Sequence, residues 1–405
     1  MQSDSDTRIK DALKKKDAYG RDIDISKYKK GRQDRDVIED LECPDNVYRD
    51  TMKSVGVTSH EESRSGTIMF IDNTMSHCSP TLAEGLEILS TQEALKKYDW
   101  VKDYFWTAVE PDKDKFTAHT YLENSDGYFI RVKSGYKIKD PIQSCMLIDS
   151  SKSIQNVHNI IIIEDGASAS LITGCATSPH ANDSVHVGIT EMFLGDDARL
   201  DFSMIHNWGS DTVVRPRTAI NIGKNSHFTN NYVILDEVGT IQTNPIANLN
   251  GEGSSAKFNS MCIAQKGSDI DNGSIVYLNA RNTSSEIISR SITMGGRMIA
   301  RGRLVGNSPG VNAHLECKSI ILTEGGTTLA IPELEANHSD LEMTHEAAVG
   351  KIARDQIEYI MSRGLSEEEA VSMIVRGFLS GGIEGLPKEL EDKIQEAVEI
   401  ANLGT

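Results

Sequence analysis

Residues 160–171 read IIIIEDGASASL, an apolar run, a polar turn around Gly166 and a second run. Three later segments have the same form around Gly195, Gly223 and Gly251, and the four glycines are 29, 28 and 28 residues apart. Strand-like runs repeated at such an interval are typical of solenoids, in which each coil stacks on the one before. The period predicts a parallel β-helix and favours it over a β-sandwich, whose turns come about every 8 to 12 residues.

The segments on either side of this β-rich region have helical character. Apolar residues at helical spacing predict an amphipathic helix, or a pair of them, over residues 82–105. After residue 345 we expect three helices, with a capping box at Ser366 and Glu369, over 346–364, 366–382 and 387–404. The chain is therefore predicted to be mainly β, with a mostly helical N-terminal region (1–119), a β-helix core (120–344) and a helical C-terminal domain (345–405).

Composition restricts the partners. The chain has 405 residues, of which 42 are basic and 60 acidic, and its net charge of -18 argues against nucleic acid or an anionic membrane. With 38% hydrophobic and 25% charged residues it has the composition of a folded domain. No stretch approaches the roughly 20 apolar residues of a membrane span, and the first residues lack the apolar core of a signal peptide. We expect a cytoplasmic protein.

Two apparent motifs are incomplete. His345 and Glu346 begin a zincin-like HExxH, but Val349 stands where the second histidine belongs, which argues against a metalloprotease. Gly350 and Lys351 lack the preceding glycine-rich loop of a nucleotide-hydrolysis site. Any ATPase activity is therefore expected to come from a partner.

The cysteines are spread along the chain without a CxxC pair, so free thiols are expected rather than a disulfide framework or a zinc ribbon. Cys175 lies in a Gly-Cys turn where a thiol could be exposed, and Cys317 lies beside Lys318 and near His314, whose charge would favour thiolate. A structural and a functional role stay open for these two. The other four, expected to be buried structural thiols, are Cys43, Cys78, Cys145 and Cys262.

Three segments resemble the SufB/SufD family, the scaffold proteins of SUF iron-sulfur cluster assembly. Residues 158–179, HNIIIIEDGASASLITGCATSP, look like a family stretch that ends in a Gly-Cys turn, and residues 202–209, FSMIHNWG, resemble a family Asn-Trp element. The most specific is 344–378, THEAAVGKIARDQIEYIMSRGLSEEEAVSMIVRGF. The resemblance implies a right-handed parallel β-helix flanked by helical domains, and a SufC-like ATPase docked on the C-terminal helices.

The resemblance also implies roles for four residues. Cys317 and Glu346 match proposed cluster-assembly residues of SufB-like proteins, His345 takes the place of a functional SufD-like histidine, and Cys175 matches the cysteine that receives sulfur. A chain carrying both kinds of residue could pair with itself, so a homodimer with Cys317, His345 and Glu346 at a symmetric interface is the working hypothesis. A paralogous subunit in place of the second copy stays open.

The chemistry expected of such a site is a transient iron-sulfur cluster. One thiolate with carboxylate or imidazole ligands releases a cluster more readily than four thiolates. Adjacent His345 and Glu346 would diverge on a strand or helix, so one of them at a time is expected to be a ligand, and Glu346 is favoured with His345 near the thiolate. Sulfur donor and cluster acceptor proteins are implied, and no flavin or nucleotide site is visible in the sequence.

Two alternatives remain. The chain could be a SufD-like structural partner without its own cluster, although the presence of Cys317 with Glu346 argues against this. It could also be a β-helix carbohydrate-active enzyme, but the acidic turns lie in loops and no secretion signal is visible. The favoured prediction is an assembly scaffold rather than an enzyme.

Overall fold

The computed structural model describes residues 2–33, 35–42, 48–79 and 83–380. They form a parallel β-solenoid of about 8 turns, with 46% of residues in strands and 16% in helices. The predicted mainly β fold and its parallel coils are confirmed. The right-handed sense and the division into three domains stay predictions.

The strands form two sheets that enclose the core. The 13-stranded sheet, sheet A, consists of β1 (Lys29–Lys30), β4 (Leu86–Ser90), β5 (Tyr128–Val132), β7 (Ser153–Ile163), β9 (Val185–Leu194), β11 (Val213–Val214), β12 (Arg217–Ile222), β14 (Thr240–Thr243), β15 (Ile246–Leu249), β17 (Asp269–Asn272), β18 (Ile275–Leu278), β20 (Arg297–Gly306) and β22 (Thr327–Ala336). The 10-stranded sheet, sheet B, consists of β2 (Gly66–Ile71), β3 (Thr74–Cys78), β6 (Ile142–Ile148), β8 (Ser168–Thr177), β10 (Arg199–Asn207), β13 (His227–Ile234), β16 (Ser255–Gln265), β19 (Ser284–Met294), β21 (Val311–Ile321) and β23 (Leu341–Gly350).

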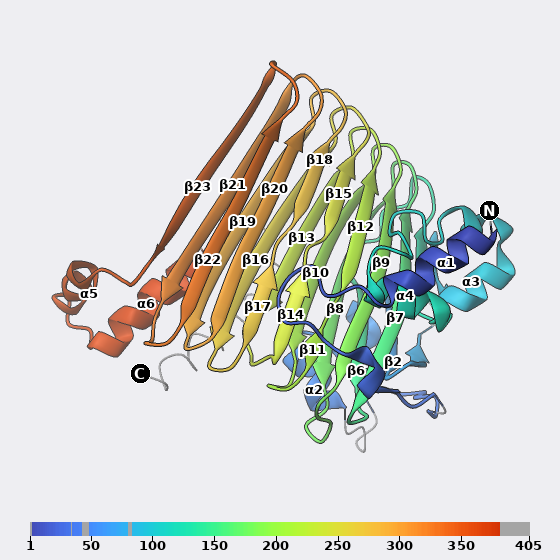
Figure 1. Ribbon diagram of the computed structural model, residues 1–405, viewed down its shortest axis with the longest axis horizontal. Coiled ribbons are helices and arrows are strands. Elements are labelled where there is room, and N and C mark those ends of the chain that lie inside the picture. Colours follow the sequence, from blue (N-terminus) through green and yellow to red (C-terminus); the bar gives the residue numbers. More distant parts are fainter. Residues whose placement is uncertain (1, 34, 43–47, 80–82, 381–405) are drawn as a thin grey trace.

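Short helices lie around this stack (Figure 1). They are α1 (Gln2–Ala12), η1 (Ile25–Lys27), α2 (Arg49–Ser54), η2 (Glu61–Ser63), α3 (Thr91–Lys97), η3 (Asp99–Asp103), α4 (Lys115–Leu122), α5 (Arg354–Met361) and α6 (Glu367–Ser380). Helices α1, α3 and α4 lie at the N-terminal end of the solenoid, and α5 and α6 lie beside the last strands. Within the described ranges no helix is long and apolar enough to cross a membrane.

The register explains the glycine period. From β6 onward, each strand of sheet B pairs in parallel with the strand one coil earlier, as Arg199 does with Ser168 and His227 with Arg199. Successive turns stack so closely that a Cβ at Gly251 would come within 2.0 Å of the Lys224 nitrogen. Only glycine fits there, so the spacing of turn glycines in the sequence is the spacing of the coils.

Side chains alternate between two faces of each strand. We call the face toward the interior of the solenoid the inner face and the opposite one the outer face. In β16, Phe258 and Cys262 point into the core between the sheets, whereas Met261 and Ile263 pack on the outer face of sheet B. The outer cluster of sheet B also contains Val375 and Leu379 of α6, among other residues.

Two helical predictions are corrected. The amphipathic helix or helix pair expected over 82–105 is interrupted, since residues 86–90 form β4, which pairs antiparallel with β5. Helix α3 begins only after Ser90, whose side chain forms a capping box with Glu93. The N-terminal 119 residues therefore contain helices but also strands β1 to β4, which extend both sheets.

At the other end, the first C-terminal helix expected over 346–364 begins only at Arg354. The preceding residues form β23, because they continue the register with β21 and stack on the last coil. Strand β23 thus continues to Gly350. The capping box at Ser366 and Glu369 is confirmed by hydrogen bonds of 2.7 and 3.2 Å. The third predicted helix, 387–404, lies outside the described residues.

Candidate functional site

Cys317 lies on the inner face of β21. Its side chain is fully buried in the core cluster that includes Leu315. Burial, reinforced by the Glu316 charge, raises the pKa of the Cys317 thiol to about 11. The expectation that Lys318 and His314 would favour thiolate is wrong, because strand alternation places these two side chains on the outer face.

His345 and Glu346 point to opposite sides of β23. His345 pairs in register with Leu315 and therefore shares the inner face with Cys317, which pairs with the next inward residue, Ala347. Glu346 pairs with Glu316 on the outer face. The structure thus brings His345 to the side of the thiol and separates Glu346 from it by the thickness of the sheet.

Glu346 belongs to a cluster on the outer face of the last two strands of sheet B. Ligand atoms of His314, Glu316 and Glu346 all lie within 4.8 Å of one another. The Lys318 Nζ is 2.6 Å from a Glu316 carboxylate oxygen and 3.1 Å from one of Glu346. We call these four residues the outer-face cluster. Burial alone would raise the pKa of Glu316, but hydrogen bonds from Lys318 and Arg290 lower it.

Sequence reasoning did not select Glu316, and it treated His314 only as a neighbour of the thiol. The usable signal was strand periodicity. Residues 314, 316 and 318 alternate with 315 and 317, so a strand assignment over 311–321 would have placed them together on one face.

Cys175 lies within β8, not in an exposed turn. Its side chain is 1% exposed, and burial raises the pKa of its thiol well above the ordinary value. The preceding Gly174 is required by packing, because a Cβ there would lie 2.4 Å from a Val55 methyl group. The expectation of an exposed thiol is therefore wrong.

The remaining cysteines differ from one another. Cys145 and Cys262 are buried, as expected, whereas Cys78 is exposed. Cys43 lies outside the described residues. All five described cysteines are free thiols.

The inner face between Cys175 and Cys317 is partly polar. Cys175 pairs with His206 on β10, and His206 is followed one coil later by Ile234 and then by Cys262. The Trp208 indole donates to His206 Nδ1 at 3.0 Å, so Nε2 carries the proton of the neutral ring. Burial lowers the pKa of His206 to about 3, and Nε2 finds no hydrogen-bond partner among the described residues.

The two thiols are far apart. From β8 to β21 there are five strand steps in sheet B, which at roughly 4.8 Å each amounts to about 24 Å. A sulfur atom could therefore not pass directly from Cys175 to Cys317.

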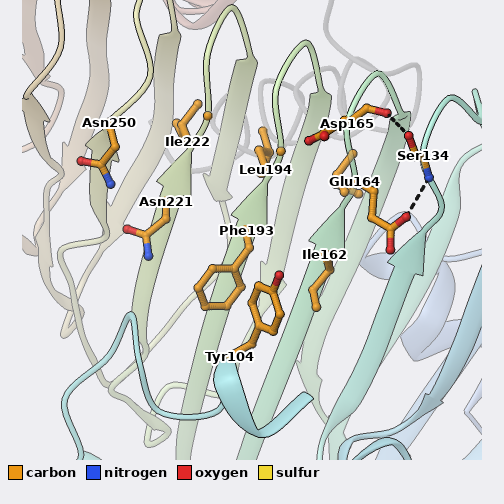
Figure 2. Close-up of a pocket in the computed structure, with 13 residues that line it drawn as sticks. Tyr104, Ser134, Ile162, Glu164, Asp165, Phe193, Leu194, Asn221, Ile222 and Asn250 are labelled. Carbon is orange, nitrogen blue, oxygen red and sulfur yellow. Dashed lines mark hydrogen bonds between the residues drawn. The ribbon is translucent and has the colours of Figure 1, made fainter. Parts of the chain in front are cut away.

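A groove of about 520 Å³ lies elsewhere (Figure 2). Tyr104 and Phe193 form an edge-to-face pair at 4.9 Å in it, and Figure 2 shows Glu164 and Asp165 at the adjoining turn. Glu164 is engaged by Arg131 and by the Ser134 amide. The groove contains none of the predicted site residues.

A second groove, of about 450 Å³, lies by the C-terminal helices. Its walls are mainly apolar, with charged residues at their margins, and are formed by Ile321, Leu322, Lys351, Ile352, Ile357, Glu367, Glu368 and Val371.

Comparison with known proteins shows the family of the chain. The family model described as SUF system FeS cluster assembly, SufBD core domain, matches residues 146–378. The chain is 41% identical to an iron-sulfur cluster assembly SufBD family protein of Methanothermobacter thermautotrophicus (strain Delta H), over 100% of both chains. It is 43% identical to a protein of the same description from Archaeoglobus fulgidus, over 88% of this chain and 95% of the relative. A Pyrococcus horikoshii relative is 31% identical over 79% of this chain and 72% of its own length.

Proposed function

The chain belongs to the SufBD family of iron-sulfur cluster assembly proteins, and from this premise we propose that it is a cytoplasmic scaffold on which a transient cluster is built between two copies. The single observation that carries the proposal is the last coil, where no described strand pairs with the free side of β23 and His345 lies on the inner face next to the strand of Cys317. The chain itself acts as a scaffold rather than as an enzyme.

The last coil supports pairing with a second copy. Strands β22 and β23 are 10 residues each and, within the described residues, each pairs on one side only. Their inward-facing Leu334 and Val349 are 41% and 45% exposed. Unpaired strand edges next to exposed apolar side chains are templates for pairing with another chain. In a two-fold symmetric dimer the second copy would present the same edges.

Such a dimer would bring together two Cys317 thiols and two His345 side chains. Thiolate and imidazole both suit iron, and a set with few thiolates favours release of the cluster. The raised pKa of Cys317 means that iron must displace the thiol proton, which makes loading pH-dependent. Glu346 would join this inner-face set only if its carboxylate left the outer face.

The C-terminal helices are the proposed docking place of a SufC-like ATPase. Tyr359 on α5 and Met373 on α6 are 63% and 44% exposed, and Ile357 and Val371 of the same helices line the groove of about 450 Å³. Closure of an ATPase dimer would pull on α6, which packs against β19 in the outer cluster of sheet B.

Cys175 is the proposed sulfur acceptor. Because the thiol is buried and about 24 Å from Cys317 by the strand spacing, we propose that local opening exposes it to a donor persulfide, whose outer sulfur passes to Cys175 while the donor thiolate leaves. A thiol reductant, itself oxidised to a disulfide, then releases this sulfur as hydrosulfide, which moves along the inner face. The polar positions His206 and Ser289, which have no hydrogen-bond partner for one side-chain atom among the described residues, support this route.

The second candidate is a structural partner that binds no cluster itself. Two observations favour it, namely that Cys317 is buried and that Glu346 faces away from it. In that case a paralogous subunit would supply the ligands.

Anaerobic reconstitution with Fe²⁺ and sulfide tests these alternatives, with and without the ATPase partner, read by absorbance and native mass. The wild type should form a brown dimer, and Cys317→Ser should lose the colour. Cys262→Ser is the matched control, because Cys262 is an equally buried thiol on the inner face of the same sheet. A colourless wild-type monomer would favour the structural partner, and a brown Cys317→Ser dimer would contradict the assigned ligand.

A further inference from the structure

Lys318 joins two carboxylates that would otherwise repel each other. Glu316 and Glu346 are directly opposite on neighbouring strands, an arrangement that destabilises a sheet when both are charged. The Lys318 ammonium binds both, at 2.6 and 3.1 Å. Hydrogen bonds to Glu316 and Glu346 raise the pKa of Lys318, so it stays charged at neutral pH.

The two carboxylates depend on Lys318 to different degrees. Glu316 is nearly buried and also forms an ion pair with Arg290. The Glu346 side chain is 56% exposed, and the ion pairs within the described part of the chain give it no cation other than Lys318. Loss of Lys318 would therefore free Glu346 more than Glu316.

The charged residues of the outer face also contact α6. The Arg290 guanidinium lies 5.8 Å from the centre of the Phe378 ring, within the range of a cation–π contact. A continuous series of contacts thus runs from Phe378 through Arg290, Glu316 and Lys318 to Glu346.

We propose that Lys318 is a positioning residue that holds the Glu346 carboxylate against Glu316 on the outer face and so keeps it from binding iron, and that α6 controls this hold through Phe378 and Arg290. The inference rests on the proposed function for the role of Glu346 as an iron ligand. When the hold is broken, the carboxylates and the His314 imidazole offer oxygen and nitrogen donors that suit Fe²⁺.

The first test measures anaerobic Fe²⁺ binding by equilibrium dialysis of the full chain without sulfide. Lys318→Met should bind Fe²⁺ more tightly than wild type, by up to about fivefold, since a competing ion pair of this exposure is removed. Lys318→Arg should stay close to wild type, and Lys318→Met combined with Glu346→Gln should return to it.

Lys257→Met is the matched control, because Lys257 forms a 2.7 Å pair with Glu286 at similar exposure. It should leave Fe²⁺ affinity unchanged, and circular dichroism should give each variant the spectrum of the folded wild type. Equal affinities of Lys318→Met and wild type, or an equal gain in Lys257→Met, would overturn the proposal.

A double-mutant cycle tests the link to α6. Phe378→Ala and Lys318→Met should change Fe²⁺ affinity non-additively, whereas the exposed Met373→Ala on the same helix should be additive with Lys318→Met. Additivity of Phe378→Ala would overturn the part assigned to α6.

Reconstitution with sulfide separates this inference from the proposed function. If the wild type builds its cluster but Lys318→Met shows no gain in Fe²⁺ affinity, the role proposed for Lys318 is wrong and the scaffold function stands. If the wild type stays colourless but Lys318→Met gains affinity, the scaffold function is wrong and the role of Lys318 stands.

Discussion

The two ends of the solenoid differ in how their strands are covered (Figure 1). At the N-terminal end, β3 and β4 pair antiparallel with β2 and β5, and α3 and η3 pack with Phe129 of β5 in one apolar cluster. At the C-terminal end, β22 and β23 keep one side without a strand partner among the described residues. We call the N-terminal end, where the chain's own segments cover the strands, the closed end. The C-terminal end, where the interface is proposed, is the open end.

The largest effect is expected from opening the closed end. Phe129 is fully buried beside Trp100, so Phe129→Ala should lower the free energy of unfolding by about 3 to 5 kcal/mol through lost burial and a cavity. Leu329 lies on the outer face of β22 and is 52% exposed, so Leu329→Ala should lower the free energy of unfolding by less than about 1 kcal/mol. Denaturant unfolding measures both, and equal costs would contradict the distinction between the ends.

Negative charges introduced at the open end should weaken self-association. Leu334→Glu with Val349→Glu places like charges where two copies are proposed to meet, which should raise the dimer Kd by at least about 30-fold. Sedimentation velocity gives the Kd. Tyr121→Glu on α4, at the closed end, is the control, and a dimer that tolerates the double change but not this one would reverse the assignment.

The closed end also depends on a buried carboxylate. Glu191 accepts hydrogen bonds from four successive backbone amides, Trp106 to Val109, and pairs with His158 at 2.8 Å. Glu191→Gln should cost about 2 kcal/mol, since charge-assisted bonds are lost in a buried site. Glu286→Gln, in a partly exposed ion pair, should cost about 0.5 kcal/mol or less. Chemical unfolding of both variants tests the difference.

The effect that is smallest near neutral pH is a pH dependence graded toward the open end. Burial raises the pKa of the thiols to about 12 at Cys262 and to about 11 at Cys317. The unfolded state loses these protons first, so stability is fully present below the ordinary thiol pKa of about 8.5 and falls as pH rises toward the folded-state values.

Between about pH 9 and pH 12, the free energy of unfolding of Cys262→Ala should fall less steeply with pH than that of wild type. The difference in slope should be about one proton, or roughly 1.4 kcal/mol per pH unit. Denaturant unfolding across this pH range measures the slope. A slope identical to wild type would show that the Cys262 thiol is ordinary in the folded state.

Much of the fold could be predicted because it depends on local repetition. The glycine interval predicts stacked coils, and the Ser366 capping box predicts the start of α6. The helix predictions over 82–105 and 346–364 were wrong in part because β4 and β23 gain their stability from pairing with β5 and β21. Amphipathic spacing within one segment does not contain that pairing.

The candidate site was predictable in its residue types but not in its geometry. Cys317, His345 and Glu346 lie on neighbouring strands, as a common site requires. Their division between two faces depends on a register between residues about thirty positions apart. A shift of one residue would exchange the faces, placing Glu346 with the thiol and His345 outside.

The sequence by itself determined that the chain is a solenoid with free thiols and a SufBD-like C-terminal run, because turn glycines and family motifs are properties of short segments. Only the tertiary structure decided that Cys175 and Cys317 are buried, that His345 shares the side of the thiol, and that Lys318 binds Glu346. These features arise where coils stack, and stacking joins residues that no local pattern connects.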